Sequence, residues 1–350
     1  MNEGQFEHEP YGRQAPLAEA LAEHPEEQPD PEPIPQTRAT PVLVTGASGL
    51  VGTHTCRELA RRGWKIRALV RNPEKAAGRL AGLPVEIVTA DLRDRDAVSA
   101  VLAGVAAVVH LAAIAIERRG QSYEDVNTAA TSTLLDVAQH AGVERFVHMS
   151  QNGASSDSPS RFLRSKGVAE DRVRASALEW TVLRPSVIVG PEDEFVNVLA
   201  RLVRLTPIVF PLPGGGQARF QPIAVRDVAQ AICVSLGRRE TIGGVYAIGG
   251  PAPLTLRQMV ERVLVAMHEH RVLIDVPVGI LRPLVALAAR VLPNPPVTPA
   301  LLDLLDVDNA VSDNAITRTF GITPTPFAPE ELRYLGAITA REALRSLFTR

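Results

Sequence analysis

The chain has 350 residues, which is enough for a two-lobed unit or for two domains with a substantial hydrophobic core. Its formal net charge is −2 and its arginines are scattered, so no basic surface for nucleic acid is expected. No run of about 20 uncharged apolar residues occurs, which excludes an ordinary transmembrane helix. The two cysteines, Cys56 and Cys233, lie in helical patterns and are expected to be reduced core thiols of a cytoplasmic protein. We predict no metal site.

Residues 1–39 differ in composition from the rest of the chain. They are rich in proline, glutamate and glutamine and contain few large apolar residues. Such a segment cannot bury enough apolar surface to offset the entropy lost on ordering, so we predict a disordered acidic tail. Its acidity argues against a mitochondrial transit peptide, and it lacks the apolar core of a signal peptide.

A glycine-rich turn is the strongest functional signal in the sequence. The run VLVTGASGLVG places four β-prone residues, Val42–Thr45, directly before three regularly spaced glycines, and a helical pattern over Leu50–Arg62 begins among them. A helix N-terminus offers unpaired N–H groups and the positive end of the helix dipole, and glycines let a pyrophosphate approach the backbone. The pattern predicts a dinucleotide site. The predicted contacts are Gly46, Ser48, Gly49, Leu50, Val51 and Gly52.

After residue 40, apolar β-branched runs alternate with amphipathic helical stretches, which is typical of a parallel sheet. The predicted strands are Val42–Thr45, Lys65–Val70, Val85–Thr89, Ala106–Leu111, Arg145–Met149 and Trp180–Leu183. We therefore predict an α/β fold with a doubly wound parallel (Rossmann) sheet over residues 40–190. A smaller α/β lobe is expected over residues 191–350, partly interleaved with that sheet. It should contain a strand at Val245–Ile248 and a helix that begins with a capping box at Thr255–Gln258.

Arg71 stands at the end of the second predicted strand. Folds that bind NAD place an Asp or Glu there to hold the ribose 2′-hydroxyl, but no acid occurs between Glu58 and Glu74. An arginine suits a 2′-phosphate through charge-assisted hydrogen bonds. The sequence therefore favours NADP(H), with NAD(H) as the alternative. A solvated arginine at a helix start is the competing interpretation.

Several motifs together resemble the short-chain dehydrogenase/reductases of the extended or atypical kind. They are TGASGLVG at 45–52, Asp91-Leu92, HLAA at 110–113, Asn127, Ser150, RPSVIVGPED at 184–193 and IAVRDVAQAI at 223–232. The resemblance implies three further sets of cofactor contacts. Asp91 and Leu92 would flank the adenine, Leu111, Ala112 and Ala113 would line the pyrophosphate and ribose, and Pro185 to Val187 would approach the nicotinamide.

Two segments are similar to one branch of this superfamily, the nucleotide-binding accessory subunit of respiratory complex I and its bacterial relatives. They are SRFLRSKGVAE at 160–170 and LLDLLDVDNAVSDNAITRTFGI at 301–322. This similarity implies a tightly held dinucleotide and a structural role. The partner would be a larger respiratory or membrane-associated assembly.

The superfamily's catalytic pair is Tyr-x-x-x-Lys on one helix face, where lysine lowers the tyrosine pKa and holds the nicotinamide ribose. Here the frame reads Phe162-Leu163-Arg164-Ser165-Lys166, so the lysine is kept and the hydroxyl is lost. Lys166 is predicted to bind the ribose, and Ser150 could hydrogen-bond a substrate or only cap a strand. His110 and His148 lie in apolar strand patterns and are interpreted as satisfied core histidines.

Two hypotheses follow for function, so whether the chain is an enzyme stays open. The first is a dinucleotide-binding protein with degenerate catalysis and a structural or accessory role. The alternative is an NADPH-dependent reductase, or a nucleotide-sugar epimerase/dehydratase-like enzyme, acting on an unknown small molecule. Polar residues expected near a substrate pocket, each with an ordinary surface role as the alternative, are Asn152, Asn197, Arg219 and Gln221.

The apolar segment 272–293 is interrupted by charged residues and proline. It is predicted to form a helix that lies in a membrane interface or packs under another chain, with an ordinary core helix as the alternative. A cytoplasmic location is expected, with attachment to the inner face of the membrane as the alternative.

Overall fold

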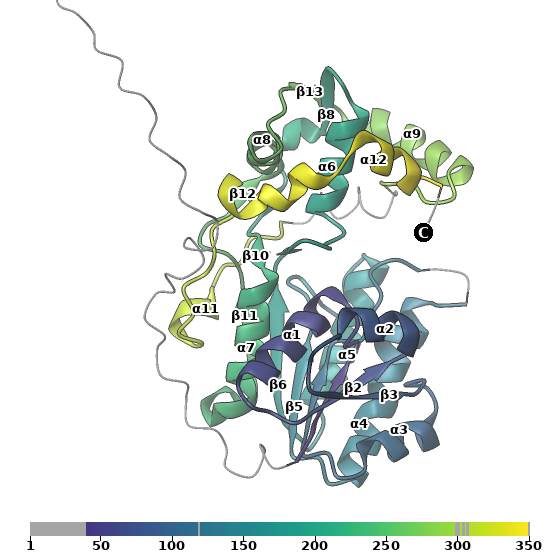
Figure 1. The fold of residues 1–350 in the computed structure, drawn as a ribbon, viewed down its shortest axis with the longest axis vertical. Helices are drawn as coiled ribbons and strands as arrows, with labels where there is room; N and C mark the ends of the chain where they lie inside the picture. Colours follow the sequence, from purple (N-terminus) through teal and green to yellow (C-terminus); the bar gives the residue numbers. More distant parts are fainter. Residues whose placement is uncertain (1–39, 118–119, 298–301, 303–304, 306–307, 349–350) are drawn as a thin grey trace, which may run out of the picture. The chain divides into compact units, whose positions relative to one another are not determined.

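The computed structural model describes residues 40–117, 120–297, 302, 305 and 308–348, so the predicted acidic tail lies outside it. In the described part, a seven-stranded sheet has the order β11-β6-β5-β4-β1-β2-β3, and every neighbouring pair is parallel (Figure 1). Its strands are β1 (Val42–Thr45), β2 (Ile66–Val70), β3 (Val85–Thr89), β4 (Ala107–His110), β5 (Arg145–Met149), β6 (Glu179–Pro185) and β11 (Gly244–Ile248). The predicted doubly wound parallel sheet is confirmed.

Helices cover both faces of this sheet because its central strands are apolar on both sides. Successive residues of β1 point to opposite faces, so Val42 and Val44 pack in one hydrophobic core and Leu43 in the other. The first core also contains residues of α1 (Leu50–Arg61), α2 (Pro73–Arg79) and α7 (Val225–Gly237). The second contains residues of α3 (Arg95–Leu102), α4 (Ala130–His140) and α5 (Arg161–Arg174). A π-helical turn, η1 (Glu124–Ala129), precedes α4.

A third hydrophobic core is built after residue 187. It is formed around three short strand pairs and several helices (Figure 1). The pairs are β7 (Ile188–Val189) with β10 (Ile223–Ala224), β9 (Arg219–Phe220) with β12 (Leu254–Thr255), and β8 (Val209–Pro213) with β13 (Val272–Val276). The helical elements around this core are α6 (Val196–Leu205), η2 (Gly214–Gly216), α8 (Leu256–Ala266), η5 (Pro329–Ala337) and α12 (Ala340–Ser346), and α9 (Val278–Val291) follows β13 with no buried residue. Two further elements lie beside the main sheet instead: η3 (Arg239–Thr241) follows α7, and α11 (Ala315–Arg318) packs in the first core.

Two elements from beyond residue 190 belong to the first domain: one is a strand of the main sheet and the other is a helix that packs against it. Strand β11 pairs with β6 at the sheet edge, and α7 packs against α1. The predicted strand at Val245–Ile248 therefore extends the first sheet. The predicted capping box is confirmed, since Gln258 N donates to Thr255 Oγ1 (3.2 Å) and Thr255 N donates to Gln258 Oε1 (2.9 Å).

The prediction of a single helix over 272–293 is wrong. Its first five residues, VLIDV, form β13 and pair with β8, and Pro277 separates this strand from α9. The β-branched residues of this segment favour the extended conformation, and the edge of β8 gives them a strand to pair with, so they form a strand and not the first turn of a helix. No helix in the described residues is long and apolar enough to cross a membrane. Cys56 and Cys233 are unpaired and buried as predicted, and burial raises the pKa of the Cys56 thiol to about 12.

Candidate functional site

The glycine turn (Gly46–Gly52) joins β1 to α1 through close backbone contacts. Gly46 has a positive φ of 67°, and a Cβ there would lie 2.9 Å from the Ala112 nitrogen. A Cβ at Gly52 would lie 2.2 Å from the Gly46 carbonyl oxygen. Gly49 precedes the first turn of α1, and no side chain caps the helix. The first amides of α1 are therefore left for an anion, which fits the pyrophosphate of a dinucleotide.

The loop after β4 is held beside this turn by Thr45. The Thr45 hydroxyl oxygen accepts hydrogen bonds from Leu111 N (3.1 Å) and Ala112 N (3.2 Å). Further along, Asn127 Oδ1 accepts from Ile114 N (2.8 Å), and Asn127 Nδ2 donates to Ser165 Oγ (3.0 Å). The structure thus brings together the glycine turn, the Leu111–Ala113 loop and the helix that carries Lys166.

The strand ends predicted to hold the adenosine also come together. Arg71 follows β2 and Asp91 follows β3, and these strands are paired. Hydrogen bonds from Arg93 lower the pKa of the Asp91 carboxyl to about 2, with a further contribution from the nearby Arg71 charge. Leu92 is half-buried against the second core. Arg71 itself is exposed, so its guanidinium is accessible to a 2′-phosphate.

Arg79, at the end of α2, is a site residue that the sequence did not reveal. Its Nη1 donates to the Ser48 carbonyl oxygen (3.0 Å), and its Nη2 lies 2.5 Å from Glu192 Oε2. One guanidinium therefore links the glycine turn to the segment after β7. In an arginine-rich chain, an arginine at the end of an exposed helix gives no sequence signal of this role.

Lys166 lies on α5 and reaches the end of β5, where Nζ donates to the Met149 carbonyl oxygen (2.7 Å). Burial lowers its pKa to about 8, and the carboxylate of Glu170 opposes that shift. Glu170 accepts two hydrogen bonds from Arg184 (2.8 and 2.7 Å). The adjacent Ser150 hydroxyl is buried and has no hydrogen-bond partner among the described residues. Lysine and serine therefore lie together at the carboxyl end of the sheet.

Phe162, one turn before Lys166 on α5, is half-buried against an aromatic neighbour. Its ring centroid lies 5.7 Å from that of Tyr123. The Tyr123 hydroxyl is already engaged, because it donates to the Ala115 carbonyl oxygen (2.8 Å). Burial also raises the pKa of Tyr123, which disfavours the tyrosinate. This neighbouring tyrosine is therefore a poor replacement for the hydroxyl that position 162 lacks.

Three of the four residues expected near a substrate use their side-chain amides to hydrogen-bond backbone groups of this chain. Asn152 Nδ2 donates to the Asn309 side chain and to the Ala310 carbonyl (both 3.2 Å). Gln221 Nε2 donates to the Gly250 carbonyl (2.8 Å), while its Oε1 accepts from Val311 N (3.0 Å). Asn197 bonds the Gly190 carbonyl and Asp193, and Arg219 is exposed. The side-chain amides of Asn152, Gln221 and Asn197 hydrogen-bond neighbouring chain segments, and those of Gln221 and Asn197 are buried and not in the surface role given as the alternative.

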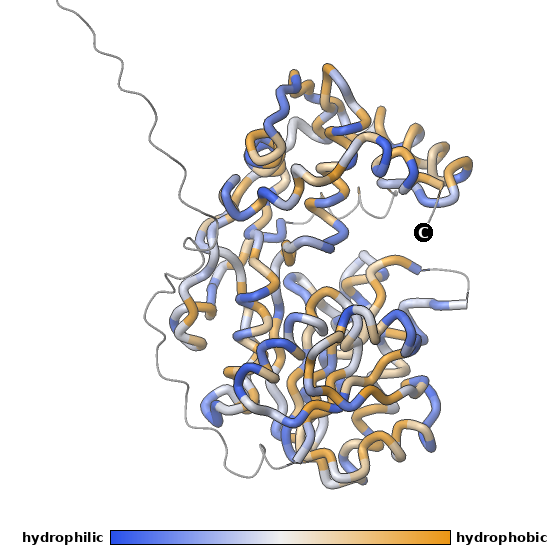
Figure 2. Tube along the Cα trace, in the orientation of Figure 1, coloured by the Kyte–Doolittle hydropathy of each residue, from blue (hydrophilic) through white to orange (hydrophobic). Residues whose placement is uncertain are grey.

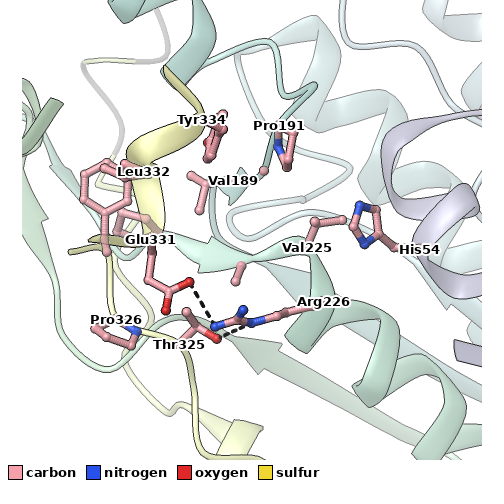
Figure 3. Close-up of a pocket in the computed structure, with 14 residues that line it drawn as sticks. His54, Val189, Pro191, Val225, Arg226, Thr325, Pro326, Glu331, Leu332 and Tyr334 are labelled. Atoms are coloured by element: carbon pink, nitrogen blue, oxygen red, sulfur yellow. Dashed lines mark hydrogen bonds and ion pairs between the residues drawn. The ribbon is translucent and has the colours of Figure 1, made fainter. Parts of the chain in front are cut away.

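A pocket of about 240 Å³ lies between α1, the start of α7 and residues 325–334 (Figure 3). Arg226 crosses one side of it, donating to Thr325 Oγ1 (2.9 Å) and pairing with Glu331 Oε2 (3.1 Å). None of the residues predicted to contact the dinucleotide lines this pocket, although Gly190, which does line it, lies beside Leu50: a Cβ at Gly190 would be 3.6 Å from the Leu50 Cδ1. In the described residues, no group of His, Cys, Asp or Glu side chains is arranged to hold a metal ion.

His110 and His148 are stacked on neighbouring strands with ring centroids 5.4 Å apart. His110 is satisfied as predicted, through the hydroxyls of Thr45 (2.8 Å) and Thr131 (2.9 Å). His148 departs from the prediction, because neither ring nitrogen has a partner among the described residues. Burial lowers the pKa of His110 to about 3 and that of His148 well below 6.5, so both rings are neutral.

We expect His148→Phe to reduce the acid sensitivity of folding. A histidine whose folded pKa is depressed stabilises the fold above its unfolded pKa of 6.5, and this stability is lost as the pH falls. Between about pH 7 and about pH 5, each such histidine should cost about 2 kcal/mol of unfolding free energy. Urea unfolding at both pH values measures the difference between variant and wild type. The exposed His270→Phe is the control, and equal pH dependence of wild type and His148→Phe would contradict the prediction.

Comparisons with known proteins agree with this geometry. A family model described as NAD(P)H-binding matches residues 46–209. The chain is 33% identical over 287 residues to NADH dehydrogenase (ubiquinone) 1 alpha subcomplex subunit 9, mitochondrial, of Arabidopsis thaliana, covering 78% of this chain and 71% of that protein. It is 33% identical over 204 residues to ceramide reductase of Caulobacter vibrioides, covering 58% of this chain and 62% of that protein.

Among solved structures, UDP-glucose 4-epimerase of Thermus thermophilus in complex with NAD superposes with a TM-score of 0.66 at 21% identity. The match covers 85% of this chain and all of that one, and it establishes the epimerase-like fold. The glycine turn, the sheet order and the extended similarity to the Arabidopsis subunit point to the same group. The chain contains an NAD(P)H-binding domain over residues 46–209, and it belongs to the family of NADH dehydrogenase (ubiquinone) 1 alpha subcomplex subunit 9.

Proposed function

We propose that this protein holds NADP(H) as an accessory or structural component and has little catalytic turnover of its own. The observation that carries the proposal is Phe162, which packs against Tyr123 where the superfamily places its acid/base tyrosine. General acid/base catalysis accounts for roughly 10²- to 10⁴-fold in rate, so a site without that hydroxyl is slow. The relatives named as subunits of NADH dehydrogenase support an accessory role, with a respiratory assembly as partner.

Each part of the dinucleotide is matched by residues of this chain. The amides of the glycine turn would bind the pyrophosphate, and the strand-end residues Asp91 and Leu92 would flank the adenine. Leu111, Ala112 and Ala113 would line the ribose and pyrophosphate, while Pro185 and Val187 would lie beside the nicotinamide. Lys166, buried and anchored on the Met149 carbonyl, would hold the nicotinamide ribose. Bound NADPH supplies a hydride; the residues around it bind, orient and exclude water.

The preference for the phosphorylated cofactor rests on Arg71. It is exposed at the end of β2, in a position suited to a 2′-phosphate, and no acid stands there to bind a free 2′-hydroxyl. A guanidinium at this position favours the cofactor with the greater negative charge. Arg79 also contacts the glycine turn at Ser48, but its ion pair with Glu192 offsets its charge.

We expect Arg71→Ala to weaken NADPH binding by about tenfold to a hundredfold while changing NADH binding little. One charge-assisted pair contributes about 1.5–3 kcal/mol, and only NADPH carries the phosphate that makes it. Isothermal titration of the purified protein with each cofactor measures both affinities. Arg95→Ala, which removes an exposed arginine paired with Asp136, is the matched control.

Mass spectrometry of the nucleotide that copurifies with the protein tests the same proposal without titration. An accessory protein that binds NADP(H) as a structural component should retain the nucleotide through purification and exchange it slowly. Rapid exchange, or equal wild-type affinities for NADPH and NADH, would contradict the proposal.

A second candidate is an NADPH-dependent reductase. Among the described residues the buried Ser150 hydroxyl has no hydrogen-bond partner, and it lies next to Met149, the residue that anchors Lys166, so a substrate oxygen that reached it would complete its hydrogen bonding. The relative named ceramide reductase supports this alternative. An enzyme of this kind would exchange its cofactor in each cycle, so the exchange rate separates the two functions. For an epimerase or dehydratase activity, the support is the shared fold.

We propose a cytoplasmic location with peripheral attachment to the inner face of the membrane. Two of the relatives are named as mitochondrial subunits of NADH dehydrogenase or NADH-ubiquinone oxidoreductase, which supports a location of this protein beside a membrane. Fractionation of cells into soluble and membrane pellets tests this placement.

A further inference from the structure

Helix α9 exposes a continuous apolar stripe. Four large aliphatic side chains are 58% to 71% exposed, namely Ile280, Leu284, Leu287 and Val291. Their spacing of four, three and four residues places all of them on one face of the helix. None of the fourteen residues of α9 is buried. Figure 2 shows the apolar character along this helix. Such a stripe in water is unfavourable and marks a surface that something covers.

Helix α12 and the residues just after it carry two further exposed apolar side chains. Leu344 and Phe348, one turn apart at its end, are 54% and 60% exposed. The ends of the two helices are tied together, because Asn294 N donates to the Leu347 carbonyl (3.0 Å) and Asn294 Nδ2 to the Ser346 carbonyl (2.8 Å). We call these six side chains and their two helices the α9–α12 face.

The charged residues of α9 and α12 themselves are mostly positive. The two helices carry four arginines and one acid, Glu342. That carboxylate is occupied at the N-terminus of α12, where it accepts hydrogen bonds from Thr339 N (2.9 Å) and Oγ1 (3.0 Å). Arg341 and Arg345 flank Leu344 on the helix surface, and Arg290 lies about a quarter turn from the α9 stripe. An apolar stripe with a cationic border is complementary to an anionic lipid surface.

We propose that the α9–α12 face docks on an anionic lipid bilayer, with α9 lying in the plane of the headgroups. With fourteen residues, α9 is shorter than the roughly 20 that a spanning helix needs, so it lies in the interface. Arginine suits that depth because its aliphatic stem packs among acyl chains while its head reaches the phosphates. A protein partner would require matching acidic groups and a shape to receive two helices, whereas a fluid bilayer requires neither. The inference goes beyond dinucleotide binding and is independent of it.

Flotation with lipid vesicles tests the proposal on the full-length protein. The protein should float with vesicles of equal parts phosphatidylcholine and phosphatidylglycerol and remain behind with phosphatidylcholine alone. The double variant Leu284→Glu with Leu287→Glu should lower binding by more than about a hundredfold, because it removes two leucines that would insert into the bilayer. Arg290→Gln and Arg341→Gln should each lower it by about fivefold and weaken its salt dependence.

Val265→Glu is the matched control, since Val265 is 61% exposed on α8, outside this face. It should bind vesicles like the wild type. Circular dichroism and NADPH titration of every variant show that the fold and the cofactor site are intact. Absence of flotation by the wild type overturns the proposal. Concentration-dependent self-association that the double glutamate variant abolishes, without vesicle binding, overturns it too and assigns the face to a second copy.

Discussion

Gly52→Ala is expected to abolish dinucleotide binding and to lower the free energy of unfolding by about 1–3 kcal/mol. An added Cβ would lie 2.2 Å from the Gly46 carbonyl oxygen and 2.7 Å from the Ala47 Cα. Both neighbours are backbone atoms of the turn, so the collision is relieved only by moving the turn itself. That movement displaces the amides that would bind the pyrophosphate. Urea unfolding and NADPH titration measure the two effects.

Gly78→Ala is the control for this substitution. Gly78 lies inside α2, and a Cβ there would meet no atom within 4 Å. Alanine has the higher helix propensity, so this variant should gain about 0.5–1 kcal/mol and bind NADPH normally. A Gly52→Ala protein that binds NADPH as tightly as the wild type would show that the turn can rearrange without cost.

Phe162→Tyr is expected to raise carbonyl reduction by roughly 10²- to 10⁴-fold, because it restores a proton donor four residues before Lys166. The added oxygen should be tolerated, since Phe162 is only half-buried and its ring already contacts Tyr123. Folding and NADPH affinity should be nearly unchanged. Loss of NADPH absorbance with a panel of aliphatic and lipid-like ketones measures the rate.

Two further variants distinguish the restored pair from a general opening of the site. Phe162→Leu removes the ring without adding a hydroxyl and should leave turnover at the wild-type level. Lys166→Ala in the Phe162→Tyr background should remove the gain, because the tyrosine pKa is then no longer lowered. It should also weaken NADPH binding. A wild-type protein that reduces a ketone at an ordinary enzymatic rate, about 10 per second, would show that another group supplies the proton. The proposal of an accessory NADP(H)-binding protein with little turnover would then be wrong.

The sequence by itself determined the features that depend on residues close together in the chain. The glycine turn, the parallel direction of the alternating strands and the capping box at Thr255 each follow from short-range spacing and backbone preference. The exchange of tyrosine for phenylalanine at position 162, with Lys166 kept four residues later, is equally local. Propensity and periodicity act over one or two turns or strands, so these features could be predicted without coordinates.

Only the tertiary structure decided which distant segments meet. The link from Arg79 to the glycine turn and Glu192 joins positions more than a hundred residues apart in the chain, and no pattern around Arg79 records it. Segment 272–276 forms a strand because it pairs with β8, and α9 has an exposed apolar stripe because none of the described elements packs over it. Contacts of this kind depend on the packing of the whole chain, which overrides local preference wherever a partner surface is available.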